Sequence, residues 1–247
     1  MKCIILAAGY ATRLYPLTKH TPKSLLEVKG KTILEWLVED LATISVIDDI
    51  FLVTNSLHYN SFDAWNSQNG NNLYIVNDET SDNGQRLGAL RDIQLVIKKQ
   101  QIDDDSLILA GDSLLDFSLQ HLIDFHQSTG SSSVMYYRND RDDDLKNRGV
   151  ICLDKYMRVT SMEEKPIQPA SNLCVPPFYV YSKDDLSCIH QAIEESNSLD
   201  SPGCFLSWIV KNTTANVCAM EMPGKRYDIG NFADYEFAKA NYPGISL

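Results

Sequence analysis

The feature that most constrains the fold is the alternation of short apolar runs with longer helical patterns in the first half of the chain. Strand-like runs occur at Cys3–Leu6, Ile50–Thr54, Leu73–Val76 and Leu107–Ala110. Helical spacing of apolar residues is found at Ile33–Leu41, near Tyr59–Asn66, at Leu87, Leu90, Ile93 and Ile97, and at Leu119, Leu122 and Ile123. This order predicts an α/β fold, a Rossmann-like, mostly parallel mixed sheet flanked by helices.

The second half is more mixed and predicts further elements of the same sheet. Two polar or proline-containing stretches, 139–148 and 166–172, have the composition of loops, and neither is typical of an interdomain linker. We therefore expect one domain over residues 1–247. The expected strands are Val134–Tyr137, Val150–Leu153, Val159–Met162 and Phe178–Tyr181, and the expected helices are Leu186–Ile193, Phe205–Val210 and one from about Ala233.

Charge and cysteine content exclude several classes of protein. A net charge of −11 argues against a nucleic-acid or anionic-membrane surface, because phosphate backbones are met by clustered Lys and Arg. The six cysteines contain no Cys-x-x-Cys pair and read as reduced thiols, and the five histidines form no ligand cluster. No run approaches the roughly 18 to 20 apolar residues of a membrane-spanning helix. We expect a cytoplasmic protein with no nucleic-acid and no membrane partner.

The connection after the first strand gathers small residues and positive charges. Ala7, Ala8 and Gly9 follow the strand directly and expose backbone N–H groups that suit a flat base and phosphate oxygens. Arg13 offers a bidentate fork and Lys23 a point charge for phosphate. The alternative is an ordinary turn with two solvated charges. The segment has neither the ending of a P-loop nor the spacing of a dinucleotide fingerprint.

Two carboxylates distant in sequence are candidate magnesium ligands. Asp112 follows the apolar run that ends at Ala110, at the expected carboxyl edge of the sheet, and Asp228 precedes the last expected helix. Mg²⁺ prefers oxygen ligands and keeps several waters. Each residue alone could instead cap a helix or stabilise a loop.

Two further polar segments are candidate binding sites. Glu164 and Lys165 end a strand-like run before Pro166, where a solvated hairpin end is the alternative. Gln85 and Arg86 precede a glycine at the expected start of a helix, where solvent exposure is the commoner fate of an arginine.

Taken in order, these segments resemble the sugar-phosphate nucleotidyltransferase family, also called NDP-sugar pyrophosphorylases, over Met1 to about Asn241. The chain departs from the family at Tyr10 and Ala11, where many members carry glycine, and at Pro176-Pro177, which replaces a small residue. The matching segments are Leu6-Ala7-Ala8-Gly9, Thr12-Arg13-Leu14, Pro16-Leu17-Thr18, Pro22-Lys23, Gly111-Asp112, Glu164-Lys165-Pro166 and Asp228-Ile229-Gly230.

The resemblance implies the fold of nucleotide-diphospho-sugar transferases and transfer of a nucleotidyl group from a nucleoside triphosphate to a sugar 1-phosphate, with release of pyrophosphate. It implies Mg²⁺ held by Asp112 and Asp228, a nucleotide-binding part over about 1–112 and an acceptor-binding part over about 113–247. The implied nucleotide-binding residues are Leu6, Ala7, Ala8, Gly9, Arg13, Lys23, Gln85, Arg86, Gly88 and Asp112. The implied catalytic residues are Arg13, Lys23, Asp112 and Lys165, and the implied acceptor-binding residues are Gly149, Glu164, Lys165 and Asn172.

Two alternatives remain at this point. One is a cytidylyltransferase that acts on a non-sugar phosphate such as phosphocholine, since fold alone does not fix the acceptor. The other is a nucleotide-sugar sensor that binds without turnover. The expected partners are a nucleoside triphosphate and a phosphorylated small molecule, and a homodimer is a common outcome for such soluble enzymes.

Overall fold

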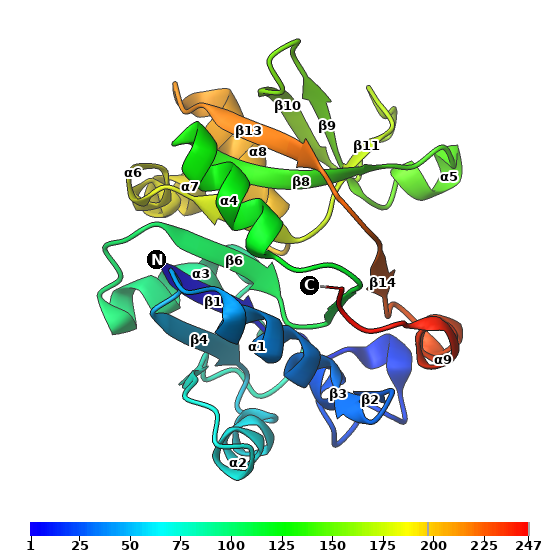
Figure 1. Cartoon of the computed structure of the whole chain (residues 1–247). Helices are drawn as coiled ribbons and strands as arrows, with labels where there is room; N and C mark the ends of the chain where they lie inside the picture. The colour runs from blue at the N-terminus through cyan, green and yellow to red at the C-terminus, as the bar shows by residue number, and fades with distance from the viewer. Residues whose placement is uncertain (197, 247) are drawn as a thin grey trace. The chain divides into compact units, whose positions relative to one another are not determined.

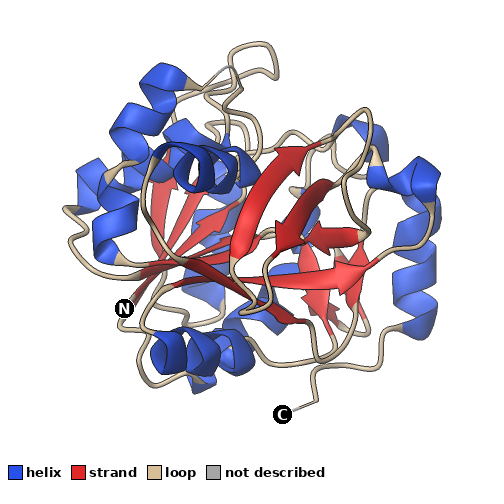
Figure 2. Cartoon of the chain, turned by 90° about the horizontal axis from the view of Figure 1, so that it is seen from above, coloured by secondary structure: helices blue, strands red, loops and turns tan. Residues whose placement is uncertain are grey.

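The computed structural model describes residues 1–196 and 198–246, except for the side chain of Asp142. The chain divides into two compact units, and both mix helices with strands (Figures 1 and 2). The first unit comprises Met1–Arg86, Ala110–Gln120 and Pro223–Leu247, and the second comprises Leu87–Leu109 and His121–Met222.

The first unit contains a parallel three-stranded arrangement. β1 (Lys2–Leu6) pairs in parallel with β4 (Asp49–Thr54), which pairs in parallel with β5 (Tyr74–Asn77). The residues Cys3, Ile4 and Ile5 of β1 are fully buried, as expected for a strand covered on both faces. All three strands therefore end at one edge, and the connections that follow them start there.

The helices and short elements of the first unit form where the sequence supplies the local signals. Thr32 and Glu35 form a capping box, because Glu35 N–H donates to Thr32 Oγ1 at 3.0 Å and Thr32 N–H donates to Glu35 Oε2 at 3.2 Å. This box begins α1 (Ile33–Thr43). The other elements are α2 (Tyr59–Gln68), the 3₁₀ turns η1 (Thr12–Leu14) and η2 (Lys23–Leu25), and the hairpin of β2 (Glu27–Val28) and β3 (Lys31–Thr32).

A second small ladder lies in the first unit and carries two of the candidate site residues at its ends. β7 (Ser113–Leu115) pairs antiparallel with β14 (Arg226–Asp228), and α9 (Phe232–Asn241) follows. Leu114 belongs to a buried apolar cluster with Ile229, and Tyr227 packs against that cluster. Arg226 and Asp228 lie on the face of β14 opposite Tyr227.

The second unit is built around a mixed sheet. Its strand order is β10-β9-β11-β8-β12-β6, with β13 parallel to β8 and the remaining pairs antiparallel. The strands are β6 (Ser106–Ala110, whose last residue belongs to the first unit), β8 (Ser132–Arg138), β9 (Gly149–Leu153), β10 (Val159–Glu164), β11 (Leu173–Val175), β12 (Phe178–Tyr181) and β13 (Val217–Glu221). The helices are α3 (Ala89–Gln100), α4 (Gln120–Thr129, whose first residue belongs to the first unit), α5 (Asp142–Leu145), α6 (Lys183–Ser187), α7 (Ile189–Glu195) and α8 (Gly203–Asn212).

The predicted α/β fold with a mixed sheet flanked by helices is confirmed, with three differences in detail. The polar run 139–148 contains the short helix α5, and the helix expected over Leu186–Ile193 is two helices that meet at Cys188. The short strands β2, β3, β7, β11 and β14, and the longer β13, were not predicted. The predicted division into parts before and after residue 112 stays a prediction, since the two units interleave along the chain.

Two further expectations concern membrane-spanning helices and the state of the cysteines. Across the described residues, every helix is too short or too polar to span a bilayer. All six cysteines are unpaired; Cys3 and Cys174 are buried and the other four are partly buried.

Candidate active site

The connection after β1 is fixed to the neighbouring strand while its tip stays open. Ala7 N–H donates to Val53 O at 2.9 Å, and Asn55 Nδ2 donates to Ala8 O at 2.9 Å. Gly9 is exposed, and a Cβ added to it would meet no atom within 4 Å. A cavity of about 180 Å³ lies beside this turn, and its lining includes Leu6, Ala7, Gly9, Lys23 and Asp112.

The two residues that depart from the family pattern are both accommodated in this connection. Ala11 has a φ of 46°, a left-handed conformation that glycine adopts more easily. Thr18 stabilises it by donating its hydroxyl to Ala11 O at 2.8 Å. Tyr10 is buried, and its hydroxyl shares a 3.1 Å hydrogen bond with that of Thr80. The turn after β1 is therefore anchored by side chains where a glycine-rich loop would lack them.

Asp112 and Lys23 form an ion pair beside the cavity. Lys23 Nζ lies 2.6 Å from Asp112 Oδ2, and the two side chains are 15% and 32% exposed. Gly111 packs closely against β1 and η2, because a Cβ there would lie 2.9 Å from Ile5 Cγ2 and 3.2 Å from Ser24 Oγ. Lys23 thus binds the carboxylate that the sequence placed at the same edge of the sheet.

Asp228 comes next to Asp112 through the β7–β14 ladder. Asp228 lies opposite Ser113 in register, and Asp112 directly precedes Ser113 in the turn before β7. Arg226 is two residues before Asp228 and therefore on the same face of β14. Its Nη2 donates to Asp228 Oδ1 at 3.1 Å and its Nε donates to Ser113 Oγ at 3.3 Å.

The charges of this cluster act on each other. Burial raises the pKa of Asp112, but the ammonium of Lys23 and the guanidinium of Arg226 outweigh burial and leave the pKa below its ordinary value. The carboxylate of Asp228 opposes this lowering. Asp112 is therefore ionised at neutral pH, in electrostatic range of both Arg226 and Asp228.

The donor set fits magnesium. Two carboxylates on adjoining strand ends supply the hard oxygen ligands that Mg²⁺ prefers, and Mg²⁺ commonly takes one or two carboxylates together with substrate phosphates. Within residues 1–196 and 198–246, no group of three or more His, Cys, Asp and Glu side chains is placed to hold a metal ion. A cation held here would draw its remaining ligands from water or substrate.

The other residues predicted to bind nucleotide lie on exposed connections or in the second unit. Arg13 is exposed in η1, and Gln85 and Arg86 are exposed before α3. Gly88 has a φ of 89°, and a Cβ there would lie 2.8 Å from Leu199 O. Local backbone packing in the second unit therefore requires glycine at this position, whatever else it contacts.

Glu164 and Gly149 are brought together in the second unit by the β9–β10 ladder. They are paired in register, and a Cβ on Gly149 would lie 3.2 Å from Glu164 Oε1. A Cβ on Gly203, at the start of α8, would overlap with the same oxygen. Ser201 donates its hydroxyl to Glu164 Oε1 at 2.8 Å. The carboxylate is thus enclosed by two glycines and held by one hydroxyl.

Glu164 has a raised pKa, whereas the pKa of Asp112 is lowered. Burial raises the pKa of Glu164, and the hydrogen bond from Ser201 and the charge of Lys165 offset it only in part. Glu164 also borders a polar cavity of about 280 Å³. Other residues of its lining are Glu195, Ser198, Cys204, Ser207, Trp208 and Lys211.

Lys165 and Asn172 occupy different places around this ladder. Lys165 is exposed and has a φ of 51°, uncommon for a residue other than glycine, and its N–H donates to Arg148 O at 2.9 Å. Asn172 donates its Nδ2 to Asp140 Oδ1 at 2.8 Å. Val175 pairs with Gly149, so Asn172 is three residues or about 10 Å further along this strand. Asn172 is therefore not grouped with Glu164.

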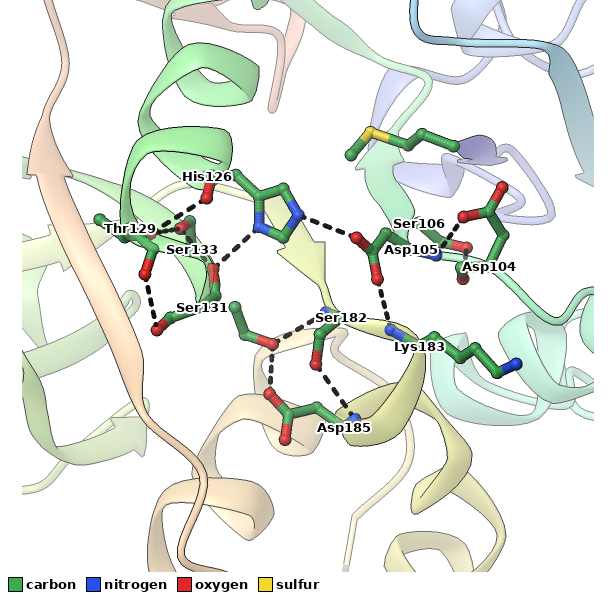
Figure 3. Close-up of polar contacts among 12 residues, drawn as sticks. Asp104, Asp105, Ser106, His126, Thr129, Ser131, Ser133, Ser182, Lys183 and Asp185 are labelled. Atoms are coloured by element: carbon green, nitrogen blue, oxygen red, sulfur yellow. Dashed lines mark hydrogen bonds and ion pairs between the residues drawn. The ribbon is translucent and has the colours of Figure 1, made fainter.

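A separate polar network of the second unit surrounds His126 (Figure 3). His126 Nδ1 lies 2.8 Å from Ser131 O, and Nε2 lies 3.3 Å from Asp105 Oδ2. Asp105 Oδ1 also accepts the N–H of Lys183 at 2.7 Å. These contacts link the segments before β6 and β8 to α6, which is a structural role.

Three residues of these sites were not predicted from the sequence: Arg226, Ser201 and Gly203. Arg226 could have been found, because i and i+2 residues share a face once 226–228 is read as a strand. Ser201 and Gly203 reach Glu164 across a separation of 37 and 39 positions, which leaves no local signal.

Comparison with known proteins identifies the family and the fold of this chain. A model of the nucleotidyl transferase family matches residues 2–243. The chain therefore belongs to the nucleotidyl transferase family.

The chain is similar over almost its whole length to proteins with names of this type. It is 29% identical over 238 residues to a Sulfolobus acidocaldarius protein named provisionally as a mannose-1-phosphate guanyltransferase, covering 95% of this chain and 61% of that protein. It is 24% identical over 239 residues to the Haloferax volcanii UTP–glucose-1-phosphate uridylyltransferase AglF, covering 97% and 95% of the two chains. The chain thus spans about six tenths of the length of the first of these relatives.

A solved structure has the same fold. UDP-glucose pyrophosphorylase complexed with UDP-glucose matches with a TM-score of 0.79 at 22% identity, covering 98% of this chain and 97% of that chain.

Proposed function

We propose that this protein transfers a nucleotidyl group from a nucleoside triphosphate to a sugar 1-phosphate, giving an NDP-sugar and pyrophosphate. Family membership and the names of the relatives support this reaction. The observation that carries it is the arrangement of Asp112 and Asp228 on adjoining strand ends, with Lys23 and Arg226 as their cations.

The first unit has the chemistry to bind the triphosphate. The open backbone at Ala7 to Gly9 leaves room for a base and for phosphate oxygens, and Arg13 and Lys23 supply positive charge. Gln85 and Arg86 belong to the same unit and are assigned to the nucleotide as well. Asp112 and Asp228 would hold Mg²⁺, which screens the repulsion between phosphate groups when bound.

The second unit has the chemistry to bind the acceptor. Lys165 offers a strongly hydrated point charge for the acceptor phosphate. Glu164, enclosed by Gly149 and Gly203, offers a carboxylate that accepts hydrogen bonds from sugar hydroxyls. Asn172 is assigned to the acceptor too, although it lies about 10 Å along β11 from the residue that pairs with Gly149. The nucleotide and the acceptor are thus assigned to the first and the second unit, and the boundary at about residue 112 stays a prediction.

The reaction needs no nucleophile from the protein. An oxygen of the acceptor phosphate, already anionic near neutral pH, forms a bond to the α-phosphorus of the triphosphate. The bond from that phosphorus to the bridging oxygen breaks, and pyrophosphate leaves with the electron pair. The side chains of Arg13, Lys23 and Lys165 therefore act by orienting two anions and offsetting their charge.

A substrate panel tests this function. Pyrophosphate release is measured for each common nucleoside triphosphate with glucose 1-phosphate, mannose 1-phosphate, N-acetylglucosamine 1-phosphate and phosphocholine, with and without Mg²⁺. Release that requires a sugar 1-phosphate and Mg²⁺ supports the proposal. Release from CTP with phosphocholine, and from no triphosphate with a sugar 1-phosphate, would make the protein a cytidylyltransferase of another class. Triphosphate binding without release from any pair would make it a sensor.

We also propose a cytoplasmic location and a homodimer. The six unpaired thiols support a reducing compartment. Cell fractionation tests the location, and light scattering on the purified protein tests the dimer.

A further inference from the structure

The guanidinium of Arg226 is paired with an aspartate of the proposed metal site, and the reaction described above gives it no task of its own. The inference below rests on that proposed function. Arg226 is 11% exposed and is held by two acceptors, Asp228 Oδ1 and Ser113 Oγ. Lys225, the preceding residue, is exposed, and its N–H donates to Asp116 Oδ1 at 2.6 Å. The position of Arg226 is therefore specific to the carboxylate cluster.

The cluster is electrically balanced. Two carboxylates, Asp112 and Asp228, face two cations, Lys23 and Arg226, so two negative and two positive charges sum to zero. The influence of Arg226 extends to Asp112, beyond its own ion pair. A divalent cation that approaches alone meets two carboxylates that are already paired with positive groups, and it must displace or oppose both of them.

The ligand set is also incomplete. In the part of the chain that the structure describes, no third acidic, histidine or cysteine side chain joins the two aspartates to form a cage. A bound triphosphate would change both the charge balance of the cluster and its set of metal ligands. It carries several negative charges, and its oxygens are ligands that Mg²⁺ accepts in place of protein groups.

We propose that Arg226, together with Lys23, neutralises Asp112 and Asp228 so that the divalent cation binds only in company with the triphosphate. Arg226 is thus a positioning residue that sets the order of binding. Its charge keeps the nucleotide-free site from capturing a bare cation, and its hydrogen bond fixes Asp228 for the metal–triphosphate complex.

Binding of Mn²⁺ to the nucleotide-free protein tests the proposal without any turnover. Water proton relaxation reports protein-bound Mn²⁺ for the wild type and for Arg226→Gln, Arg226→Lys and Lys225→Gln. We expect weak binding to the wild type and Arg226→Lys, and Mn²⁺ affinity at least about tenfold higher in Arg226→Gln, because one cation has been removed beside the ligands. Lys225→Gln removes the same charge from the preceding residue, which is exposed, and should match the wild type.

Lys23→Gln gives an independent test if Arg226→Gln does not fold, as judged by circular dichroism. It removes the other cation and should also raise Mn²⁺ affinity in the absence of nucleotide. Equal affinity in wild type and both Gln variants would overturn the inference. So would tight Mn²⁺ binding to the nucleotide-free wild type.

The same titration with UTP or GTP present separates this inference from the proposed function. If the wild type binds Mn²⁺ with a triphosphate and the variants behave as the wild type without one, only the role of Arg226 fails. If no protein binds Mn²⁺ under either condition, the metal site itself fails and the proposed function with it.

Discussion

Asp112 in the first unit and Glu164 in the second are both partly buried carboxylates, yet their surroundings differ in kind. Burial raises the pKa of both. Lys23 and Arg226 reverse the effect at Asp112, whereas the hydroxyl of Ser201 and the charge of Lys165 do not reverse it at Glu164. A nearby cation, rather than burial, therefore decides the direction of the shift.

The difference indicates what each carboxylate can bind. The Asp112 cluster contains two negative and two positive groups and is suited to a charged ligand such as a metal–triphosphate complex. Glu164 has neighbours without side chains at Gly149 and Gly203 and one hydroxyl donor, which suits further hydroxyl groups. Each prediction below changes one of these surroundings.

Removing the charge of Asp112 should have the largest effect. Asp112→Asn keeps the shape but loses a metal ligand and the partner of Lys23. Turnover should fall at least about a hundredfold, since one electrostatic group of this kind contributes about 2 to 4 kcal/mol to the transition state. Steady-state kinetics measure this fall in turnover. Asp48→Asn, an exposed aspartate of the same unit, is the control and should keep full activity. Near-normal turnover in Asp112→Asn would remove the residue from the site.

Removing the cation beside Glu164 tests the second unit. Lys165→Ala deletes the group assigned to the acceptor phosphate, and turnover should again fall at least about a hundredfold. The affinity for the triphosphate, measured without acceptor, should be unchanged, because Lys165 is assigned to the acceptor phosphate. Lys155→Ala, the control, changes an exposed lysine of the β9–β10 turn and should leave turnover unchanged. A loss of triphosphate affinity in Lys165→Ala would contradict the assignment.

A methyl group beside Glu164 should have a smaller effect. Gly203→Ala places a Cβ where Glu164 Oε1 lies, and the end of this flexible side chain must move. The KM for the sugar phosphate should rise by about three- to tenfold, with the KM for the triphosphate unchanged, because a poorly placed hydrogen bond to a charged group costs about 1 kcal/mol. In a Glu164→Ala background the same substitution should add nothing. An equal effect in both backgrounds would show that Gly203 acts on something else.

The opposite pKa shifts should appear as opposite pH dependences of stability, the smallest of these effects. The pKa of Glu164 is raised above 4.5, so its contribution to stability is present below that pH and is lost as pH rises through the folded-state pKa. The pKa of Asp112 is lowered below 3.8, so its contribution is present above that pH and is lost as pH falls.

Thermal melts of the wild type and of two variants at a series of pH values measure these two pH dependences. The Tm of Glu164→Gln should rise relative to the Tm of the wild type as pH increases from about 4 to 7. The Tm deficit of Asp112→Asn should shrink as pH falls from about 5 to 3. Parallel curves for both variants would contradict the contrast between the two carboxylates.

The sequence predicted the parts of the molecule that depend on local patterns. β1 and α1 appear where apolar runs and helical spacing placed them, and the capping box at Thr32 fixes the start of α1. Asp112 and Asp228 could be proposed as partners only through the family resemblance, since 116 positions separate them. The register of β7 and β14 is what brings them side by side.

The rest depends on tertiary contacts that leave no local trace. β14 has three residues, too few for a periodic pattern to identify it as a strand. Arg226 was therefore not predicted, although its i, i+2 spacing places it on the face of Asp228 once the strand is known. The enclosure of Glu164 needs the start of α8 to meet the end of β10. Asn172 was grouped with Glu164 by resemblance, whereas its nearest polar partner is Asp140.

The account rests on Asp112 and Asp228 holding one divalent cation with a triphosphate. A crystal structure grown with Mn²⁺ and a non-hydrolysable nucleoside triphosphate, with anomalous diffraction at the manganese edge, tests this directly. We expect one strong anomalous peak in coordination distance of both carboxylates and of triphosphate oxygens. A peak bound to the triphosphate but away from either aspartate would contradict the account.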